Sequence, residues 1–203
     1  MSDVVNGHVR DAPHAATRGR RGRLLVAVLL ATGVLLGMPP VFRTATTVRL
    51  NVSPSVPVGV YRLDANSRPA HGLLMLVCLP ESLGTFGRMR GYLLRGDCPG
   101  HAAPVGKRVL ALSGDTVQVT ARGLVLNGVV VAQSRPLRVD GHRRLLTILA
   151  IGSYIVGPGE VWVFAPDSPR SWDSRYFGAV PASGLQGRLL PIWTITAYRR
   201  QGV

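Results

Sequence analysis

Short apolar runs alternate with polar and turn-forming residues through the chain after residue 43, and this pattern predicts a mostly β domain. Asn127-Gly128 lies between two apolar runs and predicts a hairpin, and Arg122-Gly123 predicts another tight turn nearby. Glu81–Leu94 is compatible with a short helix or with an irregular insertion. The predicted strands are Thr46–Val52, Gly59–Leu63, Leu73–Cys78, Gly106–Ala111, Thr116–Thr120, Gly123–Leu126, Val129–Ala132, Ser153–Val156, Glu160–Phe164 and Leu189–Thr196.

The N-terminal part has a different pattern. Residues 24–42 form a run of 19 uncharged residues, which is near the lower limit for a helix that spans a bilayer. The polar residues 1–23 carry five arginines, and a basic flank of this kind predicts a cytoplasmic N-terminus. We therefore expect a cytoplasmic segment (1–23), a transmembrane anchor (24–42) and one external domain (43–203). A cleaved signal peptide is the alternative, although no clear A-x-A site follows the run.

The charge of the chain comes almost entirely from arginine. Of 203 residues, 23 are arginine and one, Lys107, is lysine, and the net charge is +14. The charge alone is compatible with nucleic acid, an anionic membrane or solubility, but no nucleic-acid-binding motif accompanies it, so we expect no nucleic-acid partner. An ordinary surface cation can be exchanged for arginine, whereas a lysine that has to lose its proton cannot. Lys107 is therefore a candidate general base, unless it has merely escaped the arginine bias.

Two cysteines, Cys78 and Cys98, lie 20 residues apart in the part predicted to be external. In an oxidising compartment a disulfide between them is the default interpretation, and two free thiols are the alternative. Neither cysteine has the neighbours of a redox or metal site.

Three segments contain residues suited to chemistry. In the first, Asn51–Tyr61, prolines restrict the backbone around Ser55, and a fixed backbone suits a nucleophile. In the second, Val105–Val117, Lys107 enters an apolar strand where burial would lower its pKa. The third, Phe164–Gly178, is rich in polar and aromatic residues. Each segment taken alone is equally compatible with an ordinary loop or strand.

Together, in this order, the three segments resemble the motifs of the signal peptidase I superfamily of serine–lysine proteases. The resemblance covers the anchor and nearly all of residues 46–196. The matching stretches are Ser53-Pro54-Ser55, Lys107-Arg108 with Gly114-Asp115, and Ser171-Trp172-Asp173-Ser174-Arg175-Tyr176-Phe177-Gly178.

The departures from the general signal peptidase pattern favour one branch. The methionine that follows the nucleophile there is replaced by Val56, and the proline of the lysine motif is replaced by Ser113. The stretch Asn51–Tyr61 is instead similar to the N-x-[ST]-x-S-x-P-x-G-[IVL]-Y signature of the TraF-type conjugative-transfer peptidases. The stretch from Cys78 to Gly100 also resembles that branch.

The resemblance implies a role for each site residue. Ser55 is expected to be the nucleophile, and neutral Lys107 the general base. The Ser55 N–H, with the Ser53 hydroxyl, is expected to bind the oxyanion, and Ser171 to orient the lysine amine. Asp173 and Arg175 are expected to form a supporting salt bridge. Arg108 is expected either to pair with Asp173 or to face the membrane.

The resemblance also implies a function. We expect a signal-peptidase-like β-sheet or barrel domain, periplasmic and anchored in the inner membrane of a bacterium, that contacts lipid and cleaves a pre-protein. The branch suggests a conjugative pilin precursor, with cyclisation of the product as an option. A general type I signal peptidase, a non-catalytic pilus-assembly protein and a LexA-like autoprotease are the alternatives. No metal or organic cofactor is implied, and a Ser-His-Asp triad would need His71, His101 or His142.

Overall fold

The computed structural model describes residues 48–195. Between these residues no helix is long and apolar enough to cross a bilayer. The predicted cytoplasmic segment (1–23) and anchor (24–42) lie outside the described residues, as does Thr46, the start of the first predicted strand.

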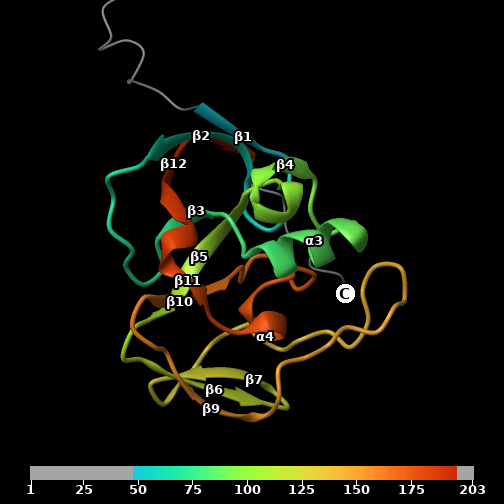
Figure 1. The fold of residues 1–203 in the computed structure, drawn as a ribbon. Helices are drawn as coiled ribbons and strands as arrows, with labels where there is room; N and C mark the ends of the chain where they lie inside the picture. The colour runs from blue at the N-terminus through green and yellow to red at the C-terminus, as the bar shows by residue number, and fades with distance from the viewer. Residues whose placement is uncertain (1–47, 196–203) are drawn as a thin grey trace, which may run out of the picture. The chain divides into compact units, whose positions relative to one another are not determined.

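The described residues form two antiparallel sheets, which confirms the prediction of a mostly β domain (Figure 1). The larger sheet has seven strands in the order β1 (Val48–Asn51), β2 (Val58–Asp64), β12 (Leu185–Ile195), β3 (Leu74–Val77), β5 (Val105–Leu112), β10 (Glu160–Phe164) and β11 (Val180–Pro181). The smaller has four in the order β8 (Val129–Val130), β7 (Gly123–Leu126), β6 (Thr116–Thr120) and β9 (Gly152–Ile155). The remaining elements are α3 (Glu81–Met89), β4 (Arg95–Cys98), α4 (Ser174–Phe177) and the 3₁₀ turns Pro99–His101 and Ala182–Gly184.

Most predicted strands are present with shifts of one or two residues at their ends. The hairpin at Asn127-Gly128 forms as predicted, and both residues have positive φ (48° and 83°), as a type I′ turn requires. Of the two possibilities for Glu81–Leu94, the short helix is the one that forms, as α3, and it ends at Met89.

Three elements were not predicted, and β12 begins earlier than expected. The sequence of β4, Arg-Gly-Asp-Cys, has no apolar alternation, while β11 and α4 have two and four residues. Strand β12 begins at Leu185 instead of Leu189, because a register shift near Gly187 breaks the alternation there.

Strand β5 is an inner strand of the larger sheet and fixes the position of Lys107. It pairs with β3 on one side and with β10 on the other. Its side chains alternate, so that Lys107, Val109 and Ala111 face the interior. Val109 belongs to the core of the larger sheet, and Ala111 packs with Trp162 against the smaller sheet. Lys107 thus occupies a core position in a strand that is held from both sides.

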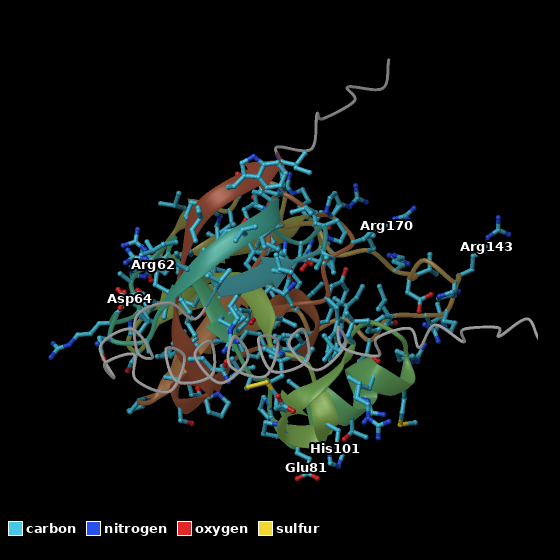
Figure 2. The ribbon with its side chains drawn as sticks, turned by 90° about the horizontal axis from the view of Figure 1, so that it is seen from above. Arg62, Asp64, Glu81, His101, Arg143 and Arg170 are labelled. Atoms are coloured by element: carbon cyan, nitrogen blue, oxygen red, sulfur yellow. A yellow bond between two sulfur atoms is a disulfide. The ribbon has the colours of Figure 1, made fainter. Side chains whose placement is uncertain are left out.

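A disulfide joins Cys78, after β3, to Cys98, at the end of β4, with a Cα–Cα distance of 5.3 Å (Figure 2). The bond closes a loop that contains α3 and β4. This loop contributes Tyr92, Leu93 and Leu94 to the cleft described below. The disulfide therefore fixes one wall of that cleft to the larger sheet.

Replacing both cysteines by alanine is expected to lower the free energy of unfolding by about 3 kcal/mol, because the cross-link restricts the unfolded chain. Urea unfolding of the full chain in detergent, followed by tryptophan fluorescence, measures this. Reducing agent should lower the stability of the wild type to that of the variant and leave the variant unchanged. Equal stability of the oxidised wild type and the variant would contradict the prediction.

Candidate active site

The loop that carries Ser55 is held by the side chain of Asn51, the last residue of β1. Its Nδ2 donates to the carbonyls of Ser53, Val56 and Pro57 at 2.9, 3.1 and 3.0 Å, and its Oδ1 accepts the N–H of Ser53 at 3.1 Å. One amide side chain thus fixes the backbone on both sides of Ser55, because each bond restrains a different part of the loop.

Two further contacts fix the C-terminal side of this loop. The Tyr61 hydroxyl donates to the Pro57 carbonyl at 2.5 Å, and Val56 is buried with Tyr61 in a small apolar core. Gly59 is needed here because a Cβ would lie 2.2 Å from the Trp193 carbonyl of β12. These contacts give a physical reason for the Asn, Gly and Tyr of the segment.

A hydrogen bond connects Ser55 to Ser53. The Ser55 N–H donates to Ser53 Oγ at 3.2 Å, while Ser53 is exposed and Ser55 is half-buried. The two groups expected to bind an oxyanion therefore lie together, and in this state the Ser55 N–H is bound to the Ser53 oxygen, whereas this bond does not use the Ser53 hydroxyl hydrogen. A substrate oxygen has to replace the Ser53 oxygen as acceptor of this N–H.

Lys107 is buried, with 4% of its surface exposed. Its Nζ donates to Ser171 Oγ at 2.6 Å. Burial lowers the pKa of Lys107 to about 8; the charge of Asp173 opposes this change, and the charge of Arg175 adds to it. At this pKa a substantial fraction of the amine is neutral near pH 8, so Lys107 can accept a proton.

Asp173 and Arg175 form a fully buried pair behind Ser171. Arg175 Nε and Nη2 donate to the two carboxylate oxygens of Asp173 at 2.8 and 2.9 Å. Arg175 Nη2 also donates to the Ser171 carbonyl at 2.8 Å. Asp173 caps α4 by accepting the Arg175 N–H, and it accepts the Ala165 N–H. The pair thus connects α4, the loop of Ser171 and the end of β10.

Arg108, next to Lys107 in β5, has two expected positions, of which only the pairing with Asp173 can be compared with the described residues. It donates to the Gly72 carbonyl at 3.1 Å and lies 3.9 Å from Asp167 at the surface. It does not pair with Asp173, because alternation in β5 directs it to the face opposite Lys107 and because Arg175 occupies the Asp173 carboxylate.

Ser55 and Lys107 line the same cleft, which has a volume of about 430 Å³. Ser53, Tyr61 and Trp172 line it too, whereas Ser171, Asp173 and Arg175 support it from behind. Within the described residues, no hydrogen bond joins Ser55 Oγ to Lys107 Nζ. Such bonds often form only when substrate is bound.

The described residues support a Ser-His-Asp triad or a metal site less well than a serine–lysine pair. His71 Nε2 lies 2.6 Å from Asp115 Oδ2, but His71 is exposed and outside the cleft that contains Ser55. Asp115 is a turn residue: burial opposes a lower pKa, but hydrogen bonds from the Leu112 N–H, Asn127 and His71 lower it. Residues 48–195 contain no group of three or more His, Cys, Asp or Glu side chains that could hold a metal ion.

One part of the cleft was not found from the sequence. Residues 138–146 form a short hairpin in which Asp140 accepts the Tyr92 hydroxyl at 2.8 Å and Arg144 Nε at 2.7 Å. Arg144 also donates to the Arg90 carbonyl at 2.6 Å. The hairpin is thereby fastened to the segment after α3, and it lines the cleft with Val139, Asp140 and Gly141. Its sequence has no apolar alternation that would have indicated this role.

Comparison with known proteins agrees with this geometry. The sequence matches the family described as signal peptidase, peptidase S26, over residues 21–194, a range that includes all the residues of the candidate site. The chain belongs to this signal peptidase family. It is 36% identical over 174 residues to the conjugal transfer protein TraF of Agrobacterium fabrum (strain C58 / ATCC 33970), covering 85% of this chain and 97% of the relative.

A second relative is the plasmid transfer protein TraF of Escherichia coli, which is 34% identical over 148 residues, or 72% of this chain and 82% of the relative. Among solved structures, a signal peptidase I from Enterococcus faecalis V583 is 23% identical, with a TM-score of 0.37, and the match covers 60% of this chain and 97% of that one. Membership of the signal peptidase family, with TraF proteins among the relatives, confirms the resemblance seen in the sequence. The chain is a signal-peptidase-like protease of the serine type.

Proposed function

We propose that this chain is a membrane-anchored endopeptidase in which Ser55 is the nucleophile and Lys107 the general base, and that it processes a secreted or membrane pre-protein. One observation carries the proposal: a serine hydroxyl and a buried amine with a pKa near 8 line a single cleft. A buried lysine lowers stability, so its presence in a core position is explained best by a need for the neutral amine.

The proposed reaction has two stages. Ser55 Oγ attacks the scissile carbonyl while Lys107 Nζ takes the hydroxyl proton, and the carbonyl becomes a tetrahedral oxyanion. The C–N bond then breaks, Lys107 delivers its proton to the leaving amine, and an acyl-enzyme remains on Ser55. Water completes hydrolysis, with Lys107 again taking the proton. If the amino group of the acylated segment itself attacks the ester carbonyl in place of water, a new C–N bond closes the ring and Ser55 Oγ leaves, taking back its proton through Lys107.

The oxyanion is bound by the Ser55 N–H and the Ser53 hydroxyl in this proposal. Support comes from their 3.2 Å contact, which keeps both groups at one point beside the nucleophile. A donor of this kind contributes about 3 kcal/mol to lowering a barrier of this type. Ser171 keeps the amine of Lys107 aimed at the cleft, and the Asp173–Arg175 pair holds Ser171.

The substrate we propose is a conjugative pilin precursor. Support comes from two relatives whose names are conjugal transfer protein TraF and plasmid transfer protein TraF. We also propose that residues 24–42 anchor the protein in the bacterial inner membrane, with the N-terminus cytoplasmic and the catalytic domain periplasmic. Support for the anchor comes from the uncharged run and its basic flank.

Cleavage is expected to accelerate with pH and to level off above about pH 8. The neutral amine is the active form, so kcat/KM should rise about tenfold per pH unit below the pKa of Lys107, which burial lowers to about 8, and stay constant above it. Initial rates with a peptide substrate between pH 6 and pH 10 measure this. A profile that stays flat across that range would contradict the assignment of Lys107 as base.

The substrate class is tested by co-expressing the full chain with a candidate pilin precursor or with an ordinary exported precursor. We expect the wild type to shorten the pilin precursor and to leave the other precursor unprocessed, with the mass of the product showing whether it is linear or cyclic. Processing of both precursors would favour the alternative function, a general type I signal peptidase. If neither precursor is processed, the result would favour the least supported alternative, a non-catalytic pilus-assembly protein.

A further inference from the structure

A second hollow lies beside the cleft and is not used by the proposed reaction. Its volume is about 1050 Å³, which is at the upper end of the range of about 300–1,000 Å³ typical of small-molecule sites. Its walls come from the end of β6, from two stretches within residues 133–151, and from Asp167 and Pro169. This size suits an extended chain segment better than a small ligand. We call this hollow the side groove.

The side groove adjoins the cleft. Leu137 and Leu146, at the two ends of the hairpin 138–146, line both hollows. Pro169 lines the side groove, while its neighbours Ser168 and Arg170 line the cleft. A polypeptide that lies across Ser55 therefore reaches the side groove over this shared wall without leaving the surface.

The side groove exposes large apolar side chains. Leu145 is 77% exposed and Ile151 is 73% exposed, and both line the groove with Ile148 and Leu149. Single exposed apolar residues are scattered over an ordinary protein surface, whereas several of them gathered in one hollow indicate a binding surface. The groove thus favours a partner with apolar side chains.

The charges of the side groove favour a partner that is also acidic. Arg135 and Arg138 line it, and within residues 48–195 neither guanidinium forms an ion pair with a carboxylate. The carboxylate in the groove, Asp167, lies 3.9 Å from Arg108. Arg170, at the adjoining edge of the cleft, adds a further exposed positive charge on the same side of the molecule as Arg143 (Figure 2).

From these observations we propose that the side groove binds a segment of the substrate polypeptide, flanking the scissile bond, in which acidic residues alternate with or adjoin large apolar ones. This inference rests on the proposed function, since it takes the occupant of the cleft to be a polypeptide substrate. The groove adds affinity and selects among precursors, while the chemistry stays at Ser55.

Binding is tested with two fluorescein-labelled dodecapeptides, one of alternating Leu and Glu and the other with Gln in place of every Glu. The full chain in detergent carries Ser55→Ala so that neither peptide is cut, and fluorescence anisotropy gives both Kd values. The groove variant is Arg135→Gln/Arg138→Gln. The matched control, Arg62→Gln/Arg68→Gln, makes the same charge change at exposed arginines outside the groove, and Arg62 lies on the opposite side from Arg170 (Figure 2).

We expect the Glu peptide to bind about three- to tenfold more tightly than the Gln peptide, which is the range for two exposed ion pairs. The groove variant should lose this preference, the control should keep it, and added salt should reduce it. A preference that survives in the groove variant, or that falls equally in the control, would overturn the proposal. So would a groove variant that changes only sedimentation or binding to phosphatidylglycerol vesicles, since the occupant would then be a second copy or lipid.

Cleavage separates this proposal from the proposed function. With Ser55 intact, the groove variant should raise KM for a precursor with an acidic and apolar flank about three- to tenfold at unchanged kcat, and leave a short peptide that spans only the cut site unaffected. Absence of cleavage by the wild type would refute the proposed function alone, because peptide binding is measured independently. Equal KM values for both enzymes on the long precursor would refute the groove.

Discussion

Replacement of Ser55 by alanine is expected to reduce processing of a pre-protein by at least about a thousandfold, as removal of a nucleophile does in serine proteases. Lys107→Arg should have an effect of similar size, because guanidinium keeps its proton at any biological pH and cannot accept the one from Ser55. Both residues line the cleft, and Lys107 is buried with 4% of its surface exposed. The sequence contains no second lysine that could replace it.

The measurement is the rate of product formation by purified full chain in detergent, with the circular dichroism spectrum as a check of folding. Two matched controls are available. Ser113→Ala removes an exposed hydroxyl in a turn, and Arg108→Lys makes the reverse exchange of cations next to Lys107, on the opposite face of β5. Both controls should keep near wild-type rates. Full activity of folded Lys107→Arg would refute the assignment of Lys107 as the base.

The second large effect is expected at Arg175. Arg175→Met should lower the free energy of unfolding by about 3–5 kcal/mol, because it leaves the Asp173 carboxylate buried without its partner. The pair has no solvent exposure, and Arg175 also donates to the Ser171 carbonyl, so the loop that holds Ser171 should loosen as well. Activity should therefore fall together with stability.

Urea unfolding followed by tryptophan fluorescence measures the change, since Trp162 is buried in the core between the two sheets. The control is Arg108→Met, which removes an exposed ion pair of 3.9 Å and should cost less than about 1 kcal/mol. If Arg175→Met and Arg108→Met proved equally mild, the proposed structural role of the buried pair would be wrong.

The sequence predicts the part of the site that depends on alternation. Val109 and Ala111 lie on the buried face of β5. Lys107 lies two residues before Val109, so alternation along the strand places it on the same face and predicts its burial. The proline-restricted segment around Ser55 was recognisable for a similar reason. Both features are local, and local patterns can be read without a structure.

The rest depends on contacts between distant residues. Asn51 holds the Ser55 loop because its side chain donates to three carbonyls up to six residues away. The hydrophobic pattern of the sequence does not predict such bonds. The hairpin 138–146 reaches the cleft through the bond from Tyr92 to Asp140, 48 residues apart. The contacts of Arg108 with Gly72 and Asp167 likewise join residues that are distant in the sequence. The roles of Ser53, Ser55, Lys107, Ser171, Asp173 and Arg175 in catalysis stay predictions.

The assignment of Ser55 as the nucleophile is tested most directly by identifying the residue that carries the acyl group during turnover. Full chain mixed with a cleavable peptide is quenched in acid, digested and mapped by mass spectrometry. We expect a mass increase equal to the acyl part of the peptide on Ser55 in the wild type, and none at that site in Ser55→Ala. An adduct on a different residue, or processing by Ser55→Ala at the wild-type rate, would contradict this assignment.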